Sequence, residues 1–172
     1  MDDTTRSERS RILGATLPDD LGAAAPALQR DDQADPEAAQ LHTMLEVAYL
    51  AAAADGELAD AEIHHLAANL SAWLQAELDQ AFLIKLFEHL GAQLAAEGAT
   101  ARLTAAAASL DPEARRTAYK LACVTALCDL EVHDDELGFL SQIAAAFEIP
   151  MEEAQATFDE LDEAVTGLAA GA

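Results

Sequence analysis

Residues 54–63 read Ala-Asp-Gly-Glu-Leu-Ala-Asp-Ala-Glu-Ile, and residues 128–137 read Cys-Asp-Leu-Glu-Val-His-Asp-Asp-Glu-Leu. The two stretches hold four carboxylates in the same register, at a constant offset of 74 residues from Asp55 to Asp129. An apolar, Ala-rich run precedes each stretch, and apolar residues at helical spacing follow it. This pattern predicts a duplicated helix-loop-helix with carboxylates clustered at each loop.

Helix start signals occur at equivalent places in the two halves, as Asp35-Pro36-Glu37 and Asp111-Pro112-Glu113. Each puts Asp at the N-cap, Pro at the first helical position and Glu in the first turn. No segment alternates between apolar and polar residues with a period of two, so no sheet is expected. The helical spacing of apolar residues predicts helices over about 36–54, 60–73, 74–96, 100–109, 112–128, 134–147 and from 150 onward.

The predicted fold is therefore all-α, with about seven or eight helices. We expect two helix-loop-helix repeats, about residues 37–96 and 100–168, packed about a pseudo-twofold axis so that their apolar stripes are buried together. Residues 1–35 are polar, charged and non-periodic, which predicts a flexible N-terminal tail, with a short helical turn around Ser7–Leu13, before a helical domain over 36–172.

The charge of the chain is strongly negative, −23 over 172 residues. Beyond residue 30 there are only five basic residues against 27 acidic ones, a balance of about −22. Such a field repels nucleic acid and anionic lipid, and it attracts cations or basic protein surfaces. We therefore expect a protein partner that binds through an acidic face, and no nucleic-acid ligand. The sequence does not indicate an oligomeric state.

The chain carries no apolar run of the roughly 20 residues that a membrane-spanning helix needs, and its N-terminus does not resemble a signal peptide. Cys123 and Cys128 are the only cysteines. Five residues apart on one helix, they point in different directions, which argues against a disulfide between them. Both fit buried thiols of a reduced, cytoplasmic protein.

Two stretches resemble the TerB-like family of tellurite-resistance and stress-response proteins. They are YLAAAADGELADAE over Tyr49–Glu62 and LDPEARRTAYKLACVTALCDLEVHDDELGFL over Leu110–Leu140, and the likeness extends over about residues 37 to 168. The resemblance implies an all-helical fold of two repeats and a non-enzymatic acidic module with a divalent-cation site. It also implies action with partner proteins in metal-stress systems.

The repeated carboxylates differ in how well local structure explains them. Asp60 and Asp134 suit N-caps. Glu62 and Glu136 fall in the first turn of the helices that follow, where the helix dipole stabilises negative charge. Asp55 and Asp129 instead fall at the C-terminal ends of their helices, where a negative charge is unfavourable. A hard cation such as Ca²⁺ or Mg²⁺ would account for them, because it binds carboxylate and carbonyl oxygens. The candidate metal ligands are Asp55, Glu57, Asp60, Glu62, Asp129, Glu131, Asp134 and Glu136.

Other readings of these loops stay open. The carboxylates fit a solvated acidic face that docks a protein without metal, and they fit plain helix capping. Leu130 stands where the first copy has Gly56, so the second loop is the weaker candidate, because a left-handed backbone costs a Leu roughly 1–2 kcal/mol.

A further alternative is a di-iron-type metalloprotein using Glu62 and His65, whose Glu-x-x-His spacing occurs in helical di-iron sites. The second copy has no matching His. No nucleophile or phosphate-binding motif is present, so no enzyme activity is expected. Arg115, Arg116 and Lys120 form the basic spot of the predicted domain, and we expect them to pair with nearby acids.

Overall fold

The computed structural model describes residues 3–18, 20–30, 35–54, 58–75, 78–128 and 134–170. Within these ranges the chain is helical and forms no strand, which confirms the predicted all-α class. The elements of this part are α1 Asp3–Ala15, α2 Ala25–Gln29, α3 Pro36–Ala52, α4 Asp60–Leu74, α5 Gln80–Glu97, α6 Ala99–Ser109, α7 Pro112–Cys128, α8 Asp134–Ala146 and α9 Met151–Ala170. No helix in the described ranges is both long enough and apolar enough to cross a membrane.

The helices α3 and α7 form the centre of the molecule, and their starts follow the predicted capping. The Asp35 carboxylate accepts a hydrogen bond from the Glu37 amide at 2.9 Å, and the Asp111 carboxylate accepts one from the Ala114 amide at 2.8 Å. Each helix spans 17 residues. Their apolar faces are almost fully buried, with Val47 and Leu121 both at 0 % exposure.

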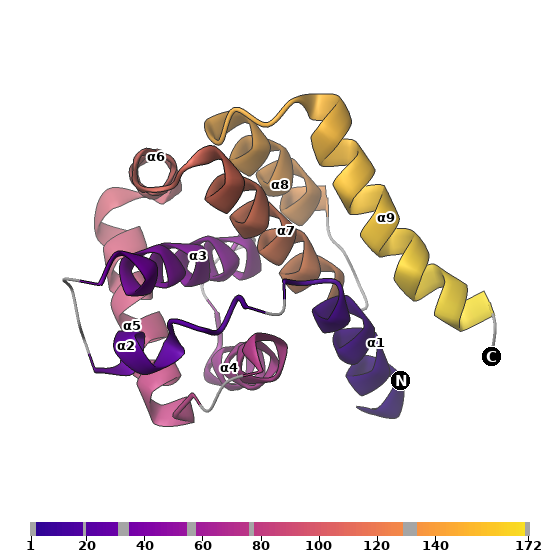
Figure 1. The fold of residues 1–172 in the computed structure, drawn as a ribbon, viewed down its shortest axis with the longest axis horizontal. Coiled ribbons are helices and arrows are strands. Elements are labelled where there is room, and N and C mark those ends of the chain that lie inside the picture. The colour runs from indigo at the N-terminus through magenta and orange to yellow at the C-terminus, as the bar shows by residue number, and fades with distance from the viewer. Residues whose placement is uncertain are drawn as a thin grey trace.

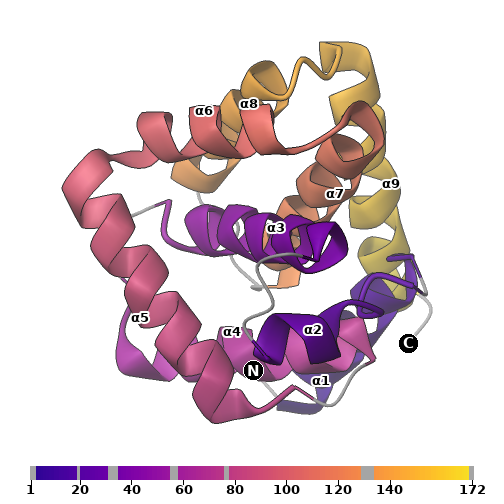
Figure 2. The ribbon, with the colours of Figure 1, turned by 60° about the vertical axis from the view of Figure 1, so that its left-hand side comes forward.

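The two central helices pack side by side and run in the same direction. Glu37 and Asp111, at their N-terminal ends, line one cavity, while Ala52 and Cys128, at their C-terminal ends, line another. The other helices cover this pair, and α3 lies in the middle of the bundle in Figure 2. The fold thus brings together the two chain segments from which the repeated acidic stretches depart.

The lengths and starting positions of four helices are compatible with the predicted repeat. α3 and α7 have the same length, and α4 and α8 begin at Asp60 and Asp134, which preserves the offset of the acidic stretches. Burial recurs at the offset of 74 residues only in part: Leu66 and Leu140 are 5 % and 3 % exposed, whereas Leu137, the counterpart of Ile63, is 39 % exposed. The pseudo-twofold axis itself remains a prediction.

One predicted helix boundary was wrong. A helix was expected from Leu74 to Ala96, whereas α4 continues through Leu74 and α5 begins only at Gln80. Gln75 ends α4 in the left-handed conformation, with φ of 50°, and the Asp79 carboxylate caps α5 by accepting from the Ala81 amide at 3.1 Å. The apolar spacing runs through this break, because the residues on either side face the same core.

The expected flexible tail also needs correction for residues 3–18 and 20–30. They contain α1 and α2, and α1 packs against α4, α7 and α9 (Figure 1). Leu13, Leu17 and Leu21, spaced four residues apart, are all buried. Their burial outweighs the polar composition on which the tail prediction rested, because each buried Leu contributes about 1.5–3 kcal/mol.

Candidate functional site

Of the eight candidate metal ligands, the structure describes two in full, two by their backbone alone and four not at all. Four of them lie outside the described residues: Asp55, Glu57, Asp129 and Glu131. The backbones of Asp134 and Glu136 belong to the first turn of α8, but their side chains are outside the described set. Asp60 and Glu62 are described in full, as exposed residues in the first turn of α4.

The predicted N-cap role of Asp60 is wrong. Ala59 is the N-cap of α4, and no side chain caps this helix end by a hydrogen bond. Asp60 is the first helical residue, and its backbone carbonyl accepts a hydrogen bond from His64 Nδ1 at 2.7 Å. Asp60 and Glu62 still lie where the helix dipole favours negative charge. Capping therefore explains less of the first acidic stretch than the sequence suggested.

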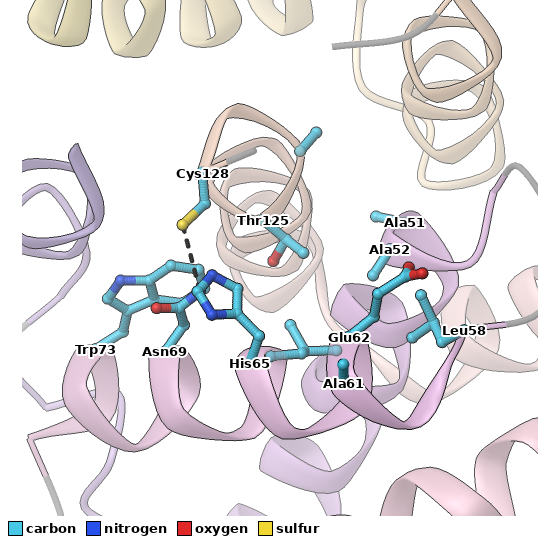
Figure 3. A pocket seen from close by; sticks show the side chains of 12 residues that line it. Ala51, Ala52, Leu58, Ala61, Glu62, His65, Asn69, Trp73, Thr125 and Cys128 are labelled. Carbon is cyan, nitrogen blue, oxygen red and sulfur yellow. Dashed lines mark hydrogen bonds between the residues drawn. The ribbon is translucent and has the colours of Figure 1, made fainter. Parts of the chain in front are cut away.

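A cavity of about 290 Å³ lies where α3, α4 and α7 meet (Figure 3). Ala51 and Ala52 come from α3, and Thr125 and Cys128 come from the last turn of α7. The wall formed by α4 carries Glu62, His65, Asn69 and Trp73. The cavity is thus bounded by the C-terminal ends of both central helices and by the helix that follows the first acidic stretch.

The polar groups of this cavity are partly engaged with one another. Asn69 Nδ2 donates to Cys128 Sγ at 3.3 Å across the cavity, as the dashed line in Figure 3 shows. Thr125 Oγ1 donates to the Leu121 carbonyl of its own helix at 2.8 Å. Glu62 and His65 lie one turn apart on α4 and are exposed at the cavity rim. Among the fully described residues, no group of three or more His, Cys, Asp or Glu side chains could hold a metal ion.

The two cysteines are buried in α7, as predicted, and neither forms a disulfide. Burial raises the pKa of Cys123 to about 12, and a hydrogen bond with Tyr119 opposes that shift only in part. Burial likewise raises the pKa of Tyr119 above its ordinary value. Cys123 is therefore a protonated thiol at neutral pH and a poor nucleophile.

The predicted basic spot pairs with acids at two of its three residues. Arg115 lies 3.4 Å from Glu148, and Arg116 forms an ion pair with Glu153. Lys120 instead donates to the backbone carbonyl of Thr16 at 2.6 Å, which ties α7 to the residue that follows α1. The last contact could not be expected from a sequence reading that treated residues 1–35 as a tail.

Sequence reasoning also missed a buried ion pair between α3 and α6. Arg102 donates to both carboxylate oxygens of Glu46 at 2.8 Å, and Glu97 lies 3.3 Å from the same guanidinium. The Glu46 side chain is 4 % exposed and that of Arg102 16 %. The hydrogen bond to Glu46 raises the pKa of Arg102 above its ordinary value. The sequence signal for this ion pair was Glu46, a charged residue inside an otherwise apolar helix face.

Comparison with known proteins supports the sequence resemblance. The family model described as tellurite resistance protein TerB matches residues 31–158. No curated protein and no solved structure matches the chain. The family match spans α3 to α8 and the first part of α9, which includes the sequence of both acidic stretches and the residues that line the cavity. Because this match covers most of the chain, the protein belongs to the TerB family of tellurite resistance proteins.

Proposed function

We propose that this protein is a non-enzymatic acidic helical module that binds a divalent cation between its two acidic stretches. The module acts with protein partners in the response to metal stress, including tellurite. The ion is Ca²⁺ or Mg²⁺, because the candidate ligands are carboxylate and carbonyl oxygens. The first acidic stretch is the stronger half of the site, since Leu130 replaces Gly56 in the second.

One observation carries the proposal: the last residues of α3 and α7, Ala52 and Cys128, line the same cavity. In the sequence, Asp129 directly follows Cys128, and Asp55 comes three residues after Ala52. Because adjacent Cα atoms are only about 3.8 Å apart, a chain of one to three residues cannot extend far from the cavity rim, and both acidic stretches therefore begin close to it. Glu62, from the start of α4, is already at that rim.

The electrostatics of this rim favour a cation. Two helices point their C-terminal ends at it, and each helix end carries about half a negative charge. The chain adds Asp55 and Asp129 at the same ends, within a domain whose overall balance is about −22. Because these charges repel one another, a bound divalent ion would lower the energy of the folded state. An oxyanion such as tellurite would instead be repelled, so any link to tellurite is indirect.

Calorimetric titration with Ca²⁺, Mg²⁺ and Mn²⁺ tests the proposal, together with thermal melts at millimolar metal. We expect heat and a raised melting temperature for the wild-type chain, and loss of both in Asp55→Asn combined with Asp129→Asn. The matched control is Asp159→Asn with Asp162→Asn on α9, which removes the same charge from exposed positions away from the cavity.

Three results would contradict the cation site. Absence of heat and stabilisation with every ion would leave docking of a basic partner as the function of the acidic stretches. If the α9 control lost the heat and the thermal stabilisation to the same extent, the metal effect would be due to the overall charge and not to a site. Loss of binding in His65→Ala, with the Asp55 and Asp129 variant unaffected, would move the site to the Glu62 and His65 pair.

A further inference from the structure

The N-terminal helix α1 lies outside the residues that match the TerB family, yet it is packed on the matched domain. It contacts α4, α7 and α9 (Figure 1). In this chain an additional segment therefore covers a surface that the matched part leaves open. We call this surface the docking face and define it by Asn69 and Trp73 of α4 and Lys120 and Leu127 of α7.

Polar contacts hold α1 at both ends of the docking face. Trp73 Nε1 donates to the Ser10 carbonyl at 3.0 Å, and Ser10 Oγ donates to Asn69 Oδ1 at 3.1 Å. Arg9 Nε donates to the Leu127 carbonyl at the C-terminal end of α7. At the other end of the docking face, Lys120 Nζ donates a hydrogen bond to the Thr16 carbonyl, just after α1. These contacts fix the position and direction of a helix on this face.

The apolar fit of α1 is close at one place and incomplete at another. Leu13 is fully buried, and a Cβ added to Gly14 would lie 2.4 Å from Trp73 Cδ1, so no larger residue fits there. Beside that contact, a cavity of about 550 Å³ remains between α1 and α4, bordered by Arg11 and Ala15. The docking face is therefore larger than α1 fills.

Charge complementarity indicates the chemistry that this face prefers. α1 carries Arg6, Arg9 and Arg11, three of the nine basic residues of the chain. Arg9 donates to the carbonyl of Leu127 at the negative end of the α7 dipole, and Leu127 is two residues before Asp129 in the sequence. An arginine at this place is favoured by both the helix end and the acidic stretch that follows it.

We propose that the docking face binds a helix of a partner protein that carries an arginine and, four residues later, a leucine, as Arg9 and Leu13 do in α1. α1 occupies the face in cis and competes with that partner helix. The proposal deepens the partner-binding part of the proposed function and does not depend on the cation. It also assigns a role to the arginine-bearing N-terminal segment.

The test uses the full chain and a fluorescein-labelled peptide with the sequence of residues 3–18 as the probe of the partner helix. Gly14→Leu should displace α1, because the added side chain overlaps Trp73. Since cis occupancy lowers apparent affinity by the fraction of open molecules, the peptide should bind Gly14→Leu at least about tenfold more tightly than the wild type. The matched control is Gly138→Leu, at an exposed position with no atom within 4 Å of the added Cβ, and it should bind like the wild type.

Two further measurements bear on the same face. Trp73 is the only tryptophan, so its emission should shift to longer wavelength in Gly14→Leu, and peptide binding should reverse the shift. A peptide with Arg9→Glu should bind Gly14→Leu at least about tenfold more weakly. If circular dichroism shows that Gly14→Leu is unfolded, the full chain with Arg9→Glu and Ser10→Ala replaces it, since these changes remove anchors without adding bulk.

The proposal is overturned if a folded, α1-displaced variant binds the peptide no more tightly than the wild type. It is also overturned if the Arg9→Glu peptide binds as tightly as the parent. A concentration-dependent dimer of the wild-type chain in sedimentation would assign the face to α1 of a second copy instead of a partner. Because none of these readouts involves metal, failure here is separate from failure of the cation titration.

Discussion

Replacing Arg102 with Met should be among the most destabilising single changes in this protein. The substitution keeps the aliphatic length of the side chain and removes the charge that faces Glu46. Glu46 lies within the buried face of α3 with only 4 % of its side chain exposed, and both of its carboxylate oxygens accept from Arg102 at 2.8 Å. After the change, a buried carboxylate would have lost its main partner.

The expected loss follows from that burial. Removing one partner of a buried ion pair costs about 3–5 kcal/mol, because the remaining charge is neither solvated nor paired. Two charge-assisted hydrogen bonds at about 1.5–3 kcal/mol each give a similar figure, about 3–6 kcal/mol. A typical domain has only about 5–15 kcal/mol of folding free energy in total, so the variant should be markedly less stable.

Urea denaturation followed by circular dichroism measures the effect as a shift of the midpoint at constant slope. Arg116→Met is the matched control, since its partner Glu153 is 40 % exposed and the loss of a surface pair should leave the midpoint nearly unchanged. The double variant Glu46→Leu with Arg102→Met should recover much of the stability, because no lone charge is left in the core. A loss below about 1 kcal/mol for Arg102→Met, or a double variant no more stable than the single one, would refute the reasoning.

Three further outcomes follow from the described contacts. Gly91→Ala should lower the free energy of unfolding by about 1–3 kcal/mol in urea melts, because the new Cβ would lie 2.7 Å from Tyr49 Oη, whereas Gly138→Ala should raise it by about 0.5–1 kcal/mol through helix propensity alone. Asp111→Ala should cost about 0.5–2 kcal/mol by removing the N-cap of α7, and Asp111→Asn should restore most of it. The free energy of unfolding should also fall as pH rises from about 9 to about 12, because the folded state holds the Cys123 thiol protonated while the unfolded chain releases the proton. Cys123→Val should make this fall smaller in thermal melts, and the part that remains comes from Tyr119, whose pKa burial also raises.

Much of the helical framework could be predicted from local signals. The Asp35-Pro36 and Asp111-Pro112 starts form the expected caps, and Gly98 ends α5 with φ of 87° as a glycine can. Such signals act within one turn of a helix, so neighbouring residues are enough to read them. The break at Gln75 was missed, because a left-handed residue other than Gly or Asn has no reliable local signature.

The candidate site was predictable only in part. The acidic stretches were visible as a repeat, and the buried positions of Cys123 and Cys128 followed from their apolar neighbours. The interpretation of Asp60 as an N-cap failed, because the choice between adjacent cap positions depends on small differences in backbone geometry.

The sequence by itself determined the all-helical class, the recurrence of the acidic stretch and the negative charge, because helix caps, apolar spacing and charge are properties of short segments. Only the tertiary structure decided that α3 and α7 end at one cavity, that α1 lies across α4 and α7, and that Glu46 meets Arg102 at a sequence separation of 56 residues. Those contacts depend on which side chains fit together across the folded core. No local pattern encodes that fit, since it requires the packing of distant segments to be known at the same time.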